Sequence, residues 1–262
     1  MKYGTSTAGA FNYHYFKEVG STNDTLAELA RQNAPEWTVV LADHQTNGRG
    51  RYRRSWHSPA GLGMWLSLLL RPAFDNRQLN FINLLAANTM ATVLEQLATT
   101  VQQQMVTGLK WPNDVWVGDK KICGILPESS FSGQKLQYII VGIGLNINQS
   151  ISDFSEDLQP IATSLKIETG REWPVKLLAT RFLEIFRQQY SEFIPNQTGK
   201  ILDEYRKKML FKNETVNLFL NDQTFSAVVR DIDDDGFLEV DHDGKTKIIN
   251  SGEFRVQPVR IN

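Results

Sequence analysis

Apolar residues in the first part of the chain recur in short, nearly continuous runs separated by polar and glycine-containing turns. Runs of this length predict buried strands, and two such runs joined by a tight turn predict a hairpin. We expect a hairpin over residues 114–129 with Gly118-Asp119 at its tip. Single strands are expected at residues 12–20, 37–45, 62–72, 106–111 and 136–148.

Four other stretches have the three- and four-residue spacing of apolar positions that is typical of helices. The first follows Ser21, which stands three residues before Asp24 as in a capping box. The helices are expected at residues 21–32, 77–98, 174–193 and 201–208. A polar segment at 149–163 is expected to be mobile. Together with the strands, this pattern predicts an α+β domain over residues 1–210.

The pattern changes at about Leu210, after which only short alternating segments occur. Turn dipeptides separate them at Asn221-Asp222, Asp235-Gly236 and Asp243-Gly244. Closely spaced short strands of this kind predict a small antiparallel β-barrel. Residues 211–262 are therefore expected to form a second, all-β domain.

Composition and charge narrow the class of protein. The 262 residues include 28 Lys+Arg and 29 Asp+Glu, and a near-neutral chain argues against a nucleic-acid partner. Cys123 is the one cysteine, which fits a reducing cytoplasm. The most apolar run, residues 60–70, is too short to span a bilayer, so no membrane partner is expected. The histidines are scattered along the sequence and predict no metal ligands: His14, His44, His57 and His242.

The stretch Gly48–Trp56 reads GRGRYRRSW and concentrates four arginines in one loop. Glycines let backbone N–H groups approach an anion while the guanidinium groups surround it. A Walker-type phosphate loop is excluded because no Gly-Lys-Ser/Thr follows. The pattern favours a small anionic ligand, with a solvated loop that only promotes solubility as the alternative.

Three further motifs could meet that loop, although each also has a purely structural interpretation. Residues 110–114 (KWPND) could form a simple turn, and residues 21–23 (STN) could only cap a helix. Gly142 and Gly144 share one face of a strand and leave a flat strip. Such a strip can receive either a ligand or a packed helix.

In this order, the segments STN, QTNGRGRYRRSW, KWPNDVWVGDKKICGIL and GIGLNIN resemble the biotin protein ligases over essentially the whole chain. The resemblance implies a mixed sheet covered by helices, as in class II synthetases, followed by an SH3-like β-barrel. Regulatory members of the family carry an N-terminal winged-helix domain. Here the pattern begins near Ser21, so we expect the short type without DNA-binding activity.

The resemblance also implies a two-step reaction. Biotin and ATP, with Mg²⁺, give biotinyl-5′-adenylate, and a lysine of a biotin carboxyl carrier protein then receives the biotinyl group. A monomer or weak homodimer is expected. The first alternative is a lipoate or octanoate ligase or transferase of related architecture. The second is a noncatalytic module that binds nucleic acid or another anion.

Residue roles follow from the resemblance, position by position. Lys121 and Arg51 are the expected catalytic residues, and Lys120 is expected to face away from the site into solvent. The expected biotin contacts are Ser21, Thr22, Asn23, Gln45, Arg49, Gly50, Arg51, Lys121, Gly124, Leu126, Gly142 and Gly144. The expected nucleotide contacts are Arg51, Arg54, Lys110, Asn113 and Asn146. The C-terminal Arg255 and Arg260 do not stand in the register of the arginine that family members often carry there.

Overall fold

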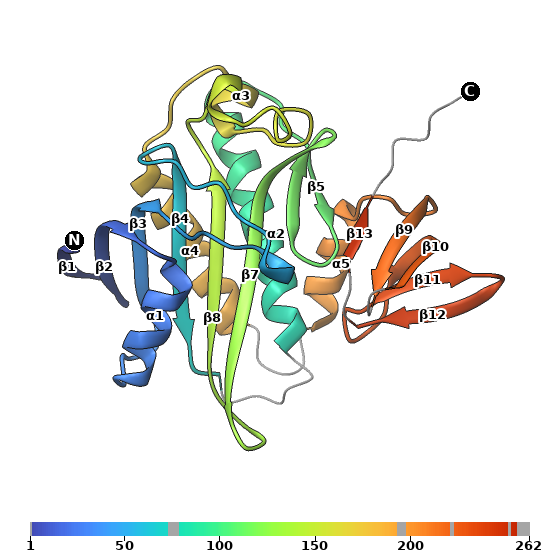
Figure 1. Ribbon diagram of the computed structural model, residues 1–262, viewed down its shortest axis with the longest axis horizontal. Coiled ribbons are helices and arrows are strands. Elements are labelled where there is room, and N and C mark those ends of the chain that lie inside the picture. Colours follow the sequence, from blue (N-terminus) through green and yellow to red (C-terminus); the bar gives the residue numbers. More distant parts are fainter. Residues whose placement is uncertain (1, 73–78, 193–197, 221–222, 251–252, 256–262) are drawn as a thin grey trace.

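The structure is a computed structural model that describes residues 2–72, 79–192, 198–220, 223–250 and 253–255. Its larger part is an eight-stranded mixed sheet in the order β1-β2-β3-β4-β8-β7-β6-β5 (Figure 1). Only β2 and β3 pair in parallel among these neighbours. The strands are β1 (Lys2–Ala8), β2 (Phe11–Val19), β3 (Thr38–Gln45), β4 (Gly63–Leu70), β5 (Thr107–Lys110), β6 (Asp114–Val117), β7 (Lys120–Ser132) and β8 (Lys135–Asn146).

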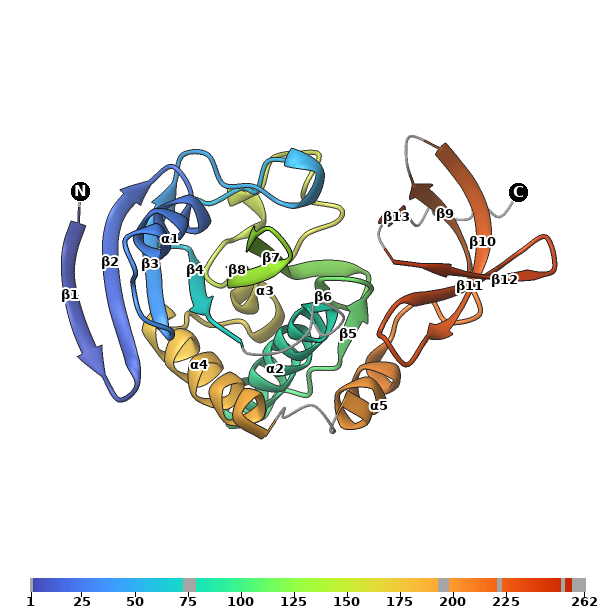
Figure 2. The ribbon, with the colours of Figure 1, turned by 90° about the horizontal axis from the view of Figure 1, so that it is seen from below.

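Helices cover both faces of this sheet (Figure 2). Helix α1 packs on one face, and α2 and α4 pack on the other. Successive residues of a strand point to opposite faces, so Val39 joins the α2 side of the core and Val40 joins the α1 side. The helices are α1 (Thr22–Arg31), α2 (Leu79–Thr100), α3 (Leu165–Thr169), α4 (Val175–Glu192) and α5 (Thr198–Lys208).

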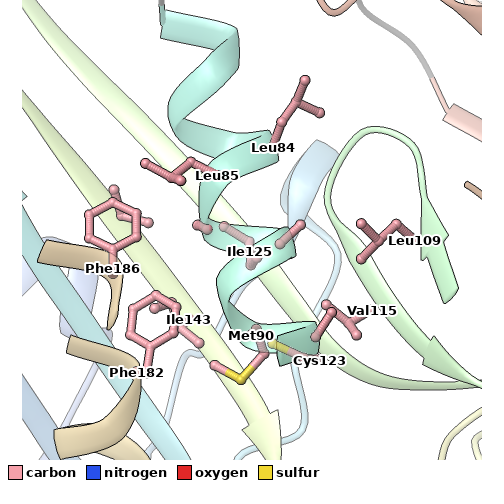
Figure 3. Packing of buried hydrophobic residues seen from close by; sticks show 14 of the residues in the cluster. Leu84, Leu85, Met90, Leu109, Val115, Cys123, Ile125, Ile143, Phe182 and Phe186 are labelled. Carbon is pink, nitrogen blue, oxygen red and sulfur yellow. The ribbon is translucent and has the colours of Figure 1, made fainter. Parts of the chain in front are cut away.

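Helix α2 lies in the middle of the larger core, which explains its apolar composition. Met90 of α2, Ile143 of β8 and Phe182 of α4 are almost completely buried in one cluster (Figure 3). Burying side chains of this size supplies most of the favourable free energy of folding. This core fixes β7 and β8, the two strands that pass beneath the candidate site.

The predicted elements agree with the structure to within a few residues, with three differences. Strand β1 and the short helix α3 were not predicted. The capping box was wrong, because the side chain of Ser21 makes no capping hydrogen bond to α1. The carboxylate of Asp24 instead contacts Arg49.

The C-terminal part is a separate five-stranded antiparallel sheet in the order β12-β11-β10-β9-β13 (Figure 1). Its strands are β9 (Thr215–Leu220), β10 (Gln223–Ile232), β11 (Leu238–His242), β12 (Lys245–Ile249) and β13 (Glu253–Arg255). The antiparallel all-β prediction is confirmed. Within the described residues, however, no β12–β13 pairing closes the predicted barrel.

The two parts contact each other through the turn before β11. The amide of Asn80 donates a hydrogen bond to the carbonyl of Gly236 at 2.6 Å, and the indole of Trp111 donates to the same carbonyl at 3.1 Å. The KWPND motif therefore also anchors the C-terminal sheet. No helix in the described ranges combines the length and apolar character needed to cross a membrane.

Candidate active site

One cavity gathers the predicted site residues from five parts of the chain. Its walls come from the start of α1, the end of β3 with the arginine loop, the KWPND turn, β7 and β8. The predicted residues that line it are Ser21, Thr22, Asn23, Gln45, Arg49, Gly50, Arg51, Arg54, Lys110, Asn113, Lys121, Gly124, Leu126, Gly142 and Gly144. Four separate motifs thus converge on one space, as a binding site requires.

The end of the cavity beside α1 is a connected set of neutral hydrogen-bonding groups. The backbone N–H of Thr22 donates to Oε1 of Gln45 at 2.9 Å, and Nε2 of Gln45 donates to Ser58 at 3.0 Å. The Ser67 hydroxyl lies 2.6 Å from Oδ1 of Asn23 and 2.8 Å from Oγ1 of Thr22. Amide and hydroxyl groups offer both donors and acceptors, so this end suits an uncharged polar ring.

The floor of the cavity depends on two glycines of β8. A Cβ atom at Gly142 would lie 2.3 Å from Oδ1 of Asn23, and one at Gly144 would lie 2.4 Å from Nε1 of Trp56. At either position an added side chain would force its neighbour to shift. The Trp56 indole therefore packs closely against Gly144, and its buried Nε1 has no hydrogen-bond partner within the described ranges.

The cationic side of the cavity centres on Lys121. Its ammonium lies 2.7 Å from Oδ1 of Asp114 and 5.0 Å from the ring centroid of Trp56. The neighbouring lysine points elsewhere, and its predicted exposure to solvent was wrong. Lys120 is partly buried, and its ammonium donates to the carbonyl of Gln159 at 3.2 Å.

The two asparagines that were predicted to contact the nucleotide hold the backbone around the cavity. The amide of Asn113 donates to the carbonyl of Ile125 at 2.7 Å and so fixes the KWPND turn to β7. Asn146 does not line the cavity: its amide donates to the carbonyl of Thr163 at 3.0 Å. It thereby tethers the end of the segment 149–163, where the N–H of Thr163 also donates to the carbonyl of Lys121.

Arg255 and Cys123 do not line the cavity. Arg255 lies in β13 opposite Asn217, and Arg260 falls outside the described residues. Burial strongly raises the pKa of the Cys123 thiol, which therefore stays neutral and is no nucleophile. No group of three or more His, Cys, Asp or Glu side chains in the described ranges could hold a metal ion.

Some residues in the cavity or hydrogen-bonded to its walls were missed by the sequence analysis. Trp56 and Asp114 stand inside the GRGRYRRSW and KWPND motifs, so those motifs could have indicated them. Ser58 and Ser67 belong to no motif, and Glu128 is one acidic residue in a strand. Only the folded arrangement brings these three toward the site.

Comparisons with known proteins identify the family of the chain. Residues 15–146 match the biotin/lipoate A/B protein ligase family, and residues 212–256 match the biotin protein ligase C-terminal domain. The chain is 34% identical over 248 residues to the bifunctional ligase/repressor BirA of Bacillus subtilis. This alignment covers 92% of this chain and 73% of that protein. It is 32% identical over 241 residues to the biotin–[acetyl-CoA-carboxylase] ligase of Mycobacterium tuberculosis, covering 90% of this chain and 85% of that protein.

Solved structures show the same similarity across both domains. The biotin protein ligase of Aquifex aeolicus in complex with biotin and ATP superposes with a TM-score of 0.77 at 30% identity. This match covers 93% of the present chain and 97% of the other. The chain therefore belongs to the biotin/lipoate A/B protein ligase family, as one of its biotin protein ligases, and is a ligase.

Proposed function

We propose that this chain activates biotin with ATP to give biotinyl-5′-adenylate, and then transfers the biotinyl group to a lysine of a biotin carboxyl carrier protein. The observation that carries this proposal is the arrangement of the cavity. A neutral polar end formed around Thr22 and Gln45 adjoins a cationic side that includes Arg51 and Lys121. Biotin has the same two parts, a neutral ureido ring and a carboxylate.

The ureido ring has N–H donors and a carbonyl acceptor, and it fits the hydroxyl and amide groups of Ser21, Thr22 and Gln45. The apolar tail of biotin would then lie along the flat strip of Gly142 and Gly144. This placement directs the carboxylate toward Arg51 and Lys121. The glycines matter because they let the tail approach the strand backbone closely.

In the first step, a carboxylate oxygen of biotin attacks the α-phosphorus of ATP. The bond from that phosphorus to the bridging oxygen breaks, and pyrophosphate leaves with the electron pair. Both reactants are anions, so the guanidinium of Arg51 and the ammonium of Lys121 are needed to offset their repulsion. Mg²⁺ enters this scheme as the companion of the ATP phosphates.

In the second step, the neutral ε-amine of the acceptor lysine attacks the carbonyl carbon of the mixed anhydride. The carbon–oxygen bond to AMP breaks, an amide forms, and the amine releases its proton to solvent. The arginine loop lies over the cavity, where it can shield the anhydride from water between the two steps. An acceptor related to acetyl-CoA carboxylase is proposed because the Mycobacterium tuberculosis relative is named for that protein.

Exchange of radiolabelled pyrophosphate into ATP tests the first step, since reversal of adenylation incorporates the label. We expect exchange with biotin and none with lipoate. Exchange with lipoate alone would favour a lipoate ligase, and no exchange with either acid would contradict adenylation. Mass spectrometry of an apo carrier domain tests the second step, with a carrier whose acceptor lysine is changed to arginine as the control.

A further inference from the structure

The first arginine of the loop, Arg49, lines the cavity, but its guanidinium is held by two carboxylates. Nη1 and Nη2 of Arg49 lie 2.5 and 2.7 Å from the two oxygens of Asp24, a bidentate pair. Nη2 also lies 3.0 and 3.1 Å from the carboxylate oxygens of Glu128. Two negative charges therefore face one guanidinium, which leaves Arg49 poorly suited to attract a third anion.

The two carboxylates come from elements outside the loop. Asp24 is in the first turn of α1, and Glu128 is in the middle of β7. Asp24 is acidic and lies in the first turn of the helix, where a negative charge also interacts favourably with the helix dipole. Arg49 thus joins the beginning of the loop to one helix and one central strand.

Glu128 connects this ion pair to the polar end of the cavity. Its Oε2 accepts a hydrogen bond from Nδ2 of Asn23 at 2.7 Å. Oδ1 of the same Asn23 lies 2.6 Å from the hydroxyl of Ser67. The group that orients the Asn23 amide is therefore also a group that holds the loop.

The part of the loop beyond this attachment has a strained backbone. Tyr52 and Arg53 have φ values of 55° and 57°, in the left-handed region that side chains other than glycine rarely adopt. Tyr52 is 59% exposed, so packing does little to compensate for the strain. A fixed beginning and a strained, exposed tip divide the loop into two parts with different freedom to move.

We propose that Asp24 and Glu128 are positioning residues, which clamp Arg49 and so hold the arginine loop over the adenylate. The clamp confines loop opening to residues 50–54, because Arg49 keeps its attachment to α1 and β7. The adenylate role rests on the proposed function, whereas the clamp itself can be tested without any ligand. Arg49 acts here through the loop backbone and not as a ligand of the substrate phosphates.

Limited trypsin digestion of the ligand-free protein tests the clamp directly, because Arg51, Arg53 and Arg54 are cleavage sites at the tip. In an Asp24→Asn/Glu128→Gln variant, we expect initial cleavage at these sites about three- to tenfold faster, as for the loss of two partly exposed ion pairs. Glu172→Gln, which removes an exposed pair with Lys166, is the matched control and should cleave like the parent. The single variant Asp24→Glu retains the carboxylate, so its tip should be cleaved nearly as slowly as that of the parent protein.

General destabilisation would give a different pattern, since it would speed cleavage at lysines and arginines throughout the chain. Cleavage at the tip that equals the Glu172→Gln control, or that rises equally everywhere, would overturn the clamp. A thermal unfolding curve of each variant identifies the second case independently.

Dissociation of biotinyl-adenylate tests the link to function. We expect the double variant to release adenylate about three- to tenfold faster and to raise KM for biotin more than it changes kcat. Faster cleavage with unchanged adenylate release would overturn the positioning role and leave only a structural ion pair. If the parent protein forms no adenylate from biotin, the proposed function fails, while the digestion result still decides the clamp.

Discussion

The ammonium of Lys121 lies 2.7 Å from Oδ1 of Asp114, on the neighbouring strand β6, and 5.0 Å above the indole of Trp56. The two side chains are 28% and 15% exposed, so the pair is shielded from water on most sides. A fixed, partly desolvated cation stabilises developing negative charge without reorganising during the reaction. The ion pair with Asp114 holds the ammonium in this position.

Replacing Lys121 with glutamine should slow biotin adenylation severely. Loss of a preorganised cation beside the phosphorus oxygens is expected to cost about 3–4 kcal/mol of transition-state stabilisation, or roughly two to three decades in rate. Lys120→Gln is the matched control, because it removes the same charge one residue away and retains an N–H donor for the Gln159 carbonyl. Pyrophosphate exchange rates and thermal unfolding measure the outcome, and equal losses in both variants would contradict the role of Lys121.

Arg51 and Arg53 provide a second comparison between neighbouring cations. Arg51 lines the cavity, whereas Arg53 is exposed and is absent from its lining. A charge-assisted hydrogen bond contributes roughly 1.5–3 kcal/mol, so Arg51→Ala should weaken retention of biotin and adenylate by about ten- to a hundredfold. Arg53→Ala should change both affinities less than about threefold, as for an ordinary surface substitution. Calorimetric titration of the two variants decides between them, and identical affinities would remove Arg51 from the site.

The sequence predicted those parts of the fold that depend on local pattern. Helix α2 has apolar residues at helical spacing and β4 is a short continuous apolar run, and both were located within two residues of their ends. Strand β1 reads KYGTSTA and has no apolar alternation, because it lies at the edge of the sheet and pairs only with β2. Its existence depends on that pairing and not on its own composition.

The site was predictable where short motifs carry the chemistry and unpredictable where the fold supplies it. Glycines and arginines indicated the loop and the flat wall directly. Arg49 was assigned to biotin by resemblance, and nothing local indicates that Asp24 and Glu128 hold its side chain. Those two residues are 104 positions apart. They reach one guanidinium only because β7 pairs with β8 and α1 packs against β8.

Gly144→Ala should damage the cavity because the added methyl group meets Trp56. A separation of only 2.4 Å between this methyl carbon and Nε1 forces the indole or the strand to shift, and overpacking of this kind costs about 1–3 kcal/mol. We expect biotin affinity to fall about tenfold or more with a modest loss of stability. Gly4→Ala is the matched control, since it is also a strand glycine but has no atom within 4 Å of the added methyl. Unchanged biotin binding in Gly144→Ala would show that Trp56 can move away without consequence.

A final prediction concerns a contact between α2 and α5. Glu95 of α2 accepts hydrogen bonds from the ammonium of Lys208 and from the backbone and hydroxyl of Thr107. Burial alone would raise the pKa of this carboxyl, but these hydrogen bonds outweigh burial and lower it below its ordinary value of 4.5.

Because the folded pKa is depressed, ionised Glu95 stabilises the protein above the unfolded value, and this contribution disappears as pH falls through the folded value. Glu95→Gln should therefore lower the free energy of unfolding by about 1–2 kcal/mol at pH 7 and by much less in acid below the folded pKa. Urea unfolding at a series of pH values measures both differences. Glu28→Gln is the matched control, since its pair with Arg31 is exposed and should contribute little at any pH. If Glu95→Gln lowers the free energy of unfolding by the same amount at every pH, including acid pH below the folded pKa, then packing and not the ionised carboxylate accounts for the loss.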